Sequence, residues 1–392
     1  MKQILAILLI SLFLACGSEH AKTEKEPVPA DTAEQFQPEK NPNIPKPTER
    51  KFNDIARFIA GMSPKADNTV PEKLYNEEWK SFSASFSKRW NSLDSIRYSR
   101  MRAFREKEIP LAKEKPDTLF YPFSGPDFLN ATTFFPEAKT TIMIALEPPG
   151  FLHDMNSISP DSLPGYFKSI EQSLKAVLSF SFFRTLSMAE DFKADELNGA
   201  VHLISIFMVR TGHEILDITT ARINDKGLIT GPDESGPCGI RGIRISYHKE
   251  NDSEVQHLFY FSADISDNGL AKNNCMKNMI NSIKGFYTYV KSASYLMHNT
   301  YFSNVRNAIL QNSRMVLQDD SGIPVKYFSE DKWNRTLFGT YDKPINLFAS
   351  RFQKDLKLLY DSTDKDKVKP LPFGIGYDYR QNESNLMLFS RR

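Results

Sequence analysis

The side chains of this chain that could do chemistry are scattered acids and one histidine. His213 and Asp217 have the i and i+4 spacing of metal ligands on a helix, and Glu214 stands where a general base would follow. Gly212, however, predicts the end of a helix directly before them, and the apolar residues that follow predict a strand. We therefore expect His213 and Glu214 to be polar residues of a sheet edge rather than parts of a zinc hydrolase.

A second candidate is the pair of adjacent carboxylates Asp319 and Asp320. Two neighbouring acids could bind a cation or act as acid and base. They lack the alternating spacing of a calcium loop, and Ser321 and Gly322 are typical turn residues. The sequence favours a solvated turn.

A third candidate is Asp127, which follows Pro126 and precedes apolar residues. A short acceptor at this position is typical of a helix N-cap, and Ser124 nearby has no visible partner that would make it a nucleophile. Glu147 comes at the end of a predicted buried strand, before Pro148. The candidate catalytic residues of a hydrolase would be Asp127, Glu147, His213, Glu214, Asp319 and Asp320.

The sequence contains no GxSxG, Walker, GxGxxG or HExxH motif, so it predicts no cofactor and no metal. The three cysteines show no zinc spacing. Cys238 and Cys275 could form a disulfide or remain two separate thiols. With 50 basic and 48 acidic residues and no basic stripe, nucleic acid is not an expected partner.

The N-terminus has a basic Lys2, an apolar run from Ile4 to Leu14, a small Ala15 and then Cys16. The run is too short for a membrane span, which needs about 20 apolar residues. The segment resembles the lipobox of bacterial lipoproteins, which implies removal of 1–15 and lipidation of Cys16. An ordinary cleaved signal or an uncleaved signal anchor are the alternatives.

The rest of the chain predicts three further parts. Residues 16–50 are rich in Pro, Glu and Lys and predict a disordered tether. Residues 51–115 carry apolar residues at helical spacing and predict a helical segment, which could bind a partner but more simply packs on its own domain. Residues 116–392 mix strand and helix patterns.

For the region 116–392 we expect strands in 140–147, 215–223, 241–250 and 255–265, with helices in 160–185 and 301–317. We expect a further helix in 345–360 and a closing hairpin from FGIGYDY and NLMLFSR. The fold class predicted is α+β, a mixed, largely antiparallel sheet with packed helices, preceded by a helical N-terminal segment.

Several stretches of this body resemble uncharacterised bacterial envelope proteins. They are Tyr121–Phe128, Leu146–Pro148, Asp319–Pro324 and Pro372–Tyr377. This resemblance implies no particular activity.

The leading hypothesis is a lipid-anchored protein of the bacterial cell envelope, tethered to the outer membrane, that binds a small molecule or an envelope protein. The alternatives are an envelope hydrolase using the six residues above and a structural assembly factor. Because no catalytic spacing is complete, we favour binding over catalysis.

Replacing Cys16→Ser should leave the chain unanchored or uncleaved, because stable anchoring needs at least two acyl chains, which only a modified cysteine would supply here. Membrane fractionation and intact-mass spectrometry check this. A wild-type protein with an unacylated N-terminus at another residue would contradict it.

Overall fold

The structure is a computed structural model, and it describes residues 50–109, 116–180, 197–231, 239–364, 366–377 and 380–392. The expected signal sequence and tether, including Cys16, lie outside these residues. All structural statements below concern the described residues.

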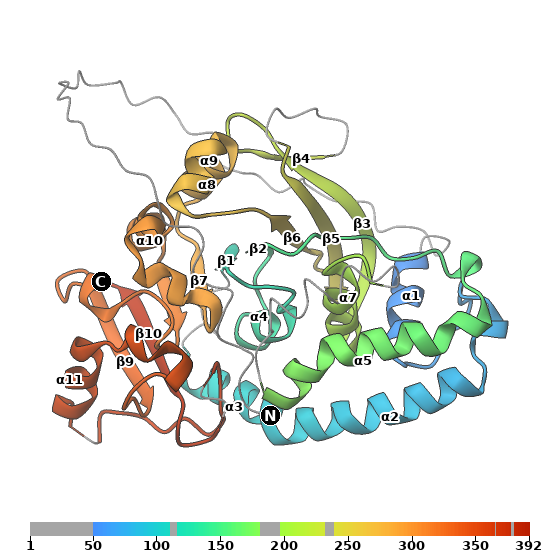
Figure 1. Cartoon of the computed structure of the whole chain (residues 1–392), viewed down its shortest axis with the longest axis horizontal. Helices are drawn as coiled ribbons and strands as arrows, with labels where there is room; N and C mark the ends of the chain where they lie inside the picture. The colour runs from blue at the N-terminus through green and yellow to red at the C-terminus, as the bar shows by residue number, and fades with distance from the viewer. Residues whose placement is uncertain (1–49, 110–115, 181–196, 232–238, 365, 378–379) are drawn as a thin grey trace, which may run out of the picture. The chain divides into compact units, whose positions relative to one another are not determined.

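A ten-stranded sheet forms the centre of the body (Figure 1). Its strands follow one another across the sheet in the order β4-β3-β5-β6-β2-β1-β7-β8-β10-β9. In chain order they are β1 (Thr118–Pro122), β2 (Thr140–Ala145), β3 (His213–Ile223), β4 (Ile229–Thr230), β5 (Arg241–Lys249), β6 (Gln256–Ser262), β7 (Tyr287–Val290), β8 (Met315–Gln318), β9 (Trp333–Gly339) and β10 (Asn385–Arg391).

The sheet is mixed, with five antiparallel and four parallel pairs, which confirms the predicted fold class. The sequence did not predict where in the sheet the parallel and the antiparallel strand pairs lie. The five central strands β6-β2-β1-β7-β8 are all parallel. The antiparallel strands β3, β4 and β5 extend one side, and β10 and β9 extend the other.

Helices cover both faces of this sheet (Figure 1). The described α-helices are α1 (Lys51–Ile59), α2 (Glu77–Leu93), α3 (Ser99–Glu108), α4 (Phe128–Phe134), α5 (Leu163–Phe180), α7 (Val201–Arg210), α8 (Asp267–Lys272), α9 (Asn274–Ser282), α10 (Ser303–Asn312) and α11 (Lys354–Ser362).

Alternate residues of each central strand point into two separate cores, as the strand period of two requires. On β1, Leu119 and Tyr121 pack with α1 to α7, whereas Phe120 packs with α8 to α11. On β2, Met143 belongs to the first core and Ile142 to the second. Burial on both faces explains why these strands read as unbroken apolar runs.

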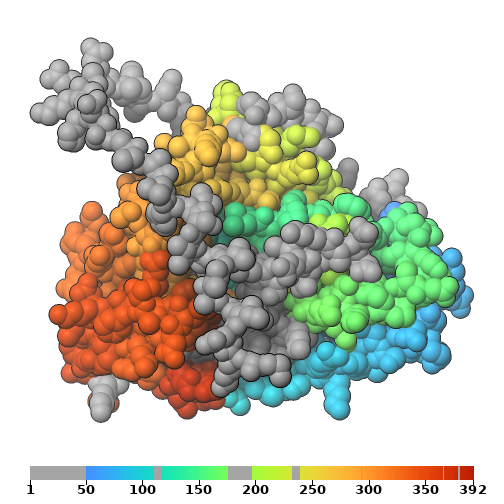
Figure 2. Space-filling view, viewed as in Figure 1, coloured from blue at the N-terminus to red at the C-terminus, as the bar shows by residue number. Residues whose placement is uncertain are grey.

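The N-terminal helices pack against the rest of the body rather than standing apart from it. Trp79 and Phe82 on α2 are buried in the first core, and Phe82 stacks on Phe167 of α5 with ring centroids 4.2 Å apart. Arg89 of α2 pairs with Glu171 of α5 at 2.5 Å, and the two helices lie side by side in Figure 2, in blue and green. The expectation that this segment packs on its own domain is confirmed.

Three predicted elements are wrong. The apolar run at the end of 301–317 is not helical, because α10 ends at Asn312 and residues 315–318 form β8. The predicted helix in 345–360 is split into the 3-10 helix Asn346–Arg351 and α11. The segment FGIGYDY forms no strand in its described part, and β10 pairs instead with β8 and β9. For β8 and β10, strand pairing with segments distant in sequence overrides the local pattern.

Among the described helices, none is long and apolar enough to cross a lipid bilayer.

Candidate functional site

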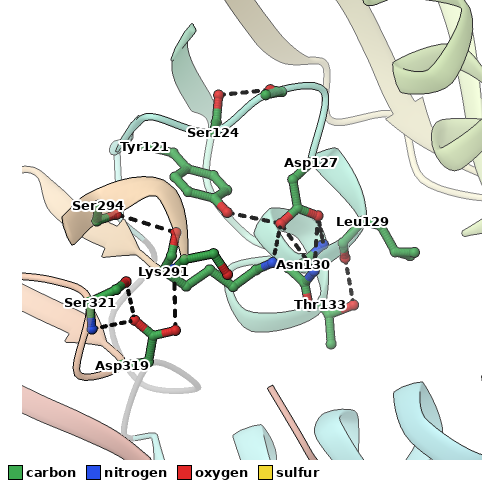
Figure 3. Close-up of polar contacts among 12 residues, drawn as sticks. Tyr121, Ser124, Asp127, Leu129, Asn130, Thr133, Lys291, Ser294, Asp319 and Ser321 are labelled. Atoms are coloured by element: carbon green, nitrogen blue, oxygen red, sulfur yellow. Dashed lines mark hydrogen bonds and ion pairs between the residues drawn. The ribbon is translucent and has the colours of Figure 1, made fainter. Parts of the chain in front are cut away.

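The carboxyl ends of three neighbouring parallel strands bring a group of charged side chains together (Figure 3). Asp127 lies in the turn after β1, Lys291 directly follows β7, and Asp319 and Asp320 directly follow β8. Because β1, β7 and β8 are parallel neighbours, their carboxyl ends share one edge of the sheet. We call this edge the carboxyl edge.

Asp127 is the most heavily bonded acid of the group. Its side chain accepts a hydrogen bond from the Asn130 backbone N–H at 3.1 Å, which confirms the predicted N-cap of α4. Tyr121 donates its hydroxyl to Asp127 Oδ2 at 2.8 Å, and Lys291 Nζ lies 3.0 Å from the same oxygen. The side chains of Lys291 and Asp127 are only 2% and 1% exposed, so this is a fully buried ion pair.

Asp319 and Asp320 are also buried, so the prediction of a solvated turn is wrong. Asp319 accepts from the backbone N–H groups of Ser292 and Ser321, at 3.2 and 3.0 Å. Asp320 accepts from Asn385 on β10 at 3.1 Å and from the Tyr295 hydroxyl. The turn residues Ser321 and Gly322 predicted an exposed turn. This prediction failed because neighbouring residues carry no information about the distant strands and loops that cover these acids.

The chain segment at Gly376 is one of the loops that cover Asp319. Gly376 has a φ of +68°, and a Cβ at this position would lie 2.2 Å from Asp319 Oδ2. Only glycine allows the backbone to come this close to the carboxylate. The segment Pro372–Tyr377, which the sequence analysis singled out by resemblance, therefore closes over the acid pair.

Burial shapes the protonation of this group. It raises the pKa of Asp319 to about 7, and the charge of Asp320 adds to the effect. Burial likewise raises the pKa of Asp320. The pKa of Tyr121 lies well above its ordinary value, because burial and the Asp127 charge oppose ionisation, so its hydroxyl stays a donor. The acid pair can hold or release a proton near neutral pH.

Two residues of the site, Lys291 and Ser292, were missed by sequence reasoning. Ser292 has a φ of +59°, which is strained for a side chain with a Cβ, and its buried hydroxyl has no hydrogen-bond partner. Their position in the sequence could have identified them. They directly follow the apolar stretch FYTYV, and polar residues just after a buried parallel strand lie at its carboxyl end, where sites form. The hydroxyl lacks a hydrogen-bonded base, which a serine nucleophile uses.

Glu147 lies at the same edge, just beyond the end of β2. Its side chain is buried, at 3% exposure for the residue, and Oε1 has no hydrogen-bond partner. Burial raises its pKa. The loop that carries it is held by α7, where the backbone N–H groups of Ala200 and Val201 donate to Pro148 and Pro149, each at 2.9 Å.

His213 and Glu214 lie elsewhere. They begin β3, and His213 pairs in register with Lys249, at the edge where the parallel strands start. Glu214 forms ion pairs with Lys65 and, at 3.6 Å, with His248. The six candidate catalytic residues are therefore divided between two edges, with Asp127, Glu147, Asp319 and Asp320 at the carboxyl edge.

Cys275, on α9, is buried and disulfide-bonded. Cys238 lies outside the described residues, so a bridge between Cys238 and Cys275 stays a prediction.

In the part of the chain that the structure describes, no group of three or more His, Cys, Asp or Glu side chains could hold a metal ion. Comparison of the chain with family models, curated proteins and solved structures gives no match.

The buried Asp319 predicts a specific pH dependence. Its folded pKa lies above the value of about 3.9 for an unfolded aspartate, so the folded state binds more protons between these values. The free energy of unfolding of the wild type, relative to Asp319→Asn, should therefore fall as pH rises from about 4 to about 7. Urea denaturation across this range measures it.

The control is Asp364→Asn, at an aspartate whose side chain is 70% exposed. The difference in free energy of unfolding between the wild type and this variant should not change with pH. A flat or rising difference for Asp319→Asn would show that Asp319 is ionised in the folded protein throughout this range.

Proposed function

We propose that the body of this protein binds a ligand carrying a ribose-like pair of hydroxyl groups at the carboxyl edge. The observation that carries the proposal is the buried carboxyl group of Glu147. It accepts hydrogen bonds from the backbone of Leu146 and Glu147, but its Oε1 has no hydrogen-bond partner among the described residues. A buried acceptor with no donor is costly unless a bound group supplies one.

The position of Glu147 in the sheet supports this reading. In doubly wound folds that bind dinucleotides, an acid roughly 20 residues beyond the first strand's turn accepts hydrogen bonds from ribose hydroxyls. Glu147 lies at this distance from the turn Ser124–Pro126, two residues beyond the end of β2, the strand next to β1.

The strand order supports it as well. From β1 the chain moves to β2 and β6 on one side, and later to β7 and β8 on the other. Open α/β sheets bind ligands at the carboxyl ends of the strands where the order reverses, which here is between β1 and β7. Asp127 and Lys291 lie at that point.

The chemistry of the edge disfavours a phosphorylated ligand. A diphosphate in a doubly wound fold binds the free N–H groups at the start of the first helix. In this chain the Asp127 carboxylate already caps α4. The edge also holds four buried carboxyl groups, on Asp127, Glu147, Asp319 and Asp320. The ammonium of Lys291 is paired with Asp127, and burial raises the pKa of the other three carboxyl groups. A phosphate-free nucleoside fits this edge better than a dinucleotide, whose diphosphate would meet the Asp127 carboxylate.

The N-terminal sequence supports the accompanying proposal that the chain is a lipid-anchored protein of the bacterial cell envelope, tethered through Cys16 to the outer membrane. A protein in this location would use the carboxyl edge to bind a nucleoside-like small molecule, with the membrane as its partner through the anchor.

A second candidate function is methyl transfer. The antiparallel β10 lies between β8 and β9, and this strand order is also that of Rossmann-like methyltransferases, an analogy of fold alone. S-adenosylmethionine bears a ribose and no phosphate, so it lacks the diphosphate that would meet Asp127, and when bound it supplies an electrophilic methyl group. Glu147 would accept hydrogen bonds from its ribose hydroxyls.

The test is calorimetric titration with adenosine, S-adenosylmethionine and NAD. We expect adenosine or S-adenosylmethionine to bind and NAD to bind at least about tenfold more weakly, because its diphosphate meets Asp127. Glu147→Gln should weaken binding by about tenfold or more, since a hydrogen bond to a charged acceptor contributes about 1.5–3 kcal/mol. The exposed Glu78→Gln is the matched control and should bind as the wild type does.

Tight binding of S-adenosylmethionine with weak binding of adenosine would favour methyl transfer over nucleoside binding. Failure of all three compounds to bind below about 1 mM would contradict the proposed function. An unchanged affinity in Glu147→Gln would contradict the role of Glu147.

A further inference from the structure

A cavity of about 720 Å³ lies at the opposite edge of the sheet, where the parallel strands begin. Its wall is formed by the end of α2, by α3, by the end of α4 and by the turn between α7 and β3. Small-molecule sites have volumes of about 300–1,000 Å³. This cavity is separate from the carboxyl edge, and the inference below does not rest on the proposed function.

The lining carries more positive than negative charge. Its basic residues are Arg102, Arg105, Arg210 and Lys249, and its acidic residues are Asp94 and Glu250.

Much of this charge is neutralised locally. Arg102 pairs with both oxygens of Asp94, at 2.7 and 2.9 Å. Lys249 pairs at 2.6 Å with Glu137, which is not itself part of the lining. These two lining cations are therefore compensated.

Arg105 and Arg210 are not compensated in this way. Arg210 donates to the backbone carbonyl of Ala60 and to Ser87, and within the described chain it forms no ion pair with a carboxylate. Among the described residues, Arg105 forms one ion pair, with Glu106 at 3.3 Å. The Glu106 side chain is 67% exposed, and an exposed ion pair of this kind is weak. The Nε of Arg105 is buried without a hydrogen-bond partner.

His213 adds a second unsatisfied group to the same wall. It is 4% exposed, and its Nε2 is buried with no hydrogen-bond partner. Its Nδ1 lies 2.9 Å from the Thr211 hydroxyl oxygen and 3.3 Å from the carbonyl oxygen of Met208. The Thr211 hydroxyl already donates to the Phe207 carbonyl, so we assign the proton to Nδ1, which leaves Nε2 of the neutral ring as an acceptor. Burial lowers the pKa of His213 to about 4, so the ring is neutral at pH 7.

We propose that this cavity binds an organic phosphate that also carries hydroxyl groups, with the anion at Arg105 and Arg210 and a hydroxyl donating to Nε2 of His213. Guanidinium groups match phosphate oxygens in geometry and charge. The Nε2 of the neutral imidazole requires a hydrogen-bond donor, and the sugar-like hydroxyl groups of the same ligand supply one. The hydroxyl groups of Thr133 and Thr211, also in the lining, donate to backbone carbonyls of their own helices and can act toward a polyol as acceptors.

The experiment is calorimetric titration of the full chain with glucose 6-phosphate, glucose and inorganic phosphate. We expect saturable binding of glucose 6-phosphate and at least about tenfold weaker binding of the other two, because each lacks one of the two recognised groups. Arg105→Gln should weaken glucose 6-phosphate binding by about tenfold or more, as loss of a charged hydrogen-bonding partner does.

The matched control is Lys107→Gln, on the same helix with an 81% exposed side chain, which should bind as the wild type does. His213→Gln should weaken glucose 6-phosphate more than inorganic phosphate. Glu147→Gln should leave glucose 6-phosphate binding unchanged, which separates this site from the carboxyl edge.

Absence of saturable glucose 6-phosphate binding would overturn the proposal. Equal losses in Arg105→Gln and Lys107→Gln would overturn it too, because the effect would then be general electrostatics. Equal affinity for inorganic phosphate and glucose 6-phosphate would overturn the role given to His213.

Discussion

The buried ion pair between Asp127 and Lys291 is the interaction on which the rest of the structure depends. It joins the end of β1 to the end of β7, the two strands between which the sheet order reverses. Each charge is out of water, so each needs the other: removing one partner of such a pair typically costs about 3–5 kcal/mol, because a bare charge is left behind. The same carboxylate caps α4 and accepts the Tyr121 hydroxyl, so one side chain fixes a strand end, a helix start and a neighbouring strand.

The two edges of the sheet differ in chemistry because the central strands are parallel. All five end at one edge, where the loops carry the buried carboxyl groups of Asp127, Glu147, Asp319 and Asp320. At the other edge, α3 and the end of α7 supply Arg105 and Arg210. The two edges therefore present different groups of buried and half-buried charged side chains, and the two binding proposals above rest on this difference.

The sequence predicted those features that depend on neighbours along the chain. Asp127 as a helix cap and a strand after Gly212 follow from the residues beside them, and both are confirmed. The strand starts at His213, two residues earlier than predicted, and His213 is buried rather than exposed at a sheet edge. The mixed sheet also followed from alternating strands such as β3 and β5. The parallel centre did not, because a strand buried on both faces has no alternation to reveal its neighbours.

The site was predictable only in part for the same reason. The acids were identified by type, but their assembly with Lys291 depends on strand pairing, which local patterns do not contain. The burial of Asp319 and Asp320 depends on Gly376 and Asn385, which come from the far end of the chain. The apolar residues 315–317 were read as helix because a short apolar run fits either element, and only pairing with β7 and β10 makes them strand.

The most direct measurement of the central claim is a double-mutant cycle on the buried pair, with Asp127→Asn, Lys291→Met and the double variant compared by urea denaturation. Asparagine keeps an acceptor for the α4 cap, so the cycle isolates the charge interaction. The exposed pair Lys367 and Asp364, with side chains 74% and 70% exposed, serves as the reference and should couple by less than about 1 kcal/mol. The account predicts a coupling energy above about 2 kcal/mol for Asp127 and Lys291, and additivity within about 0.5 kcal/mol would contradict it.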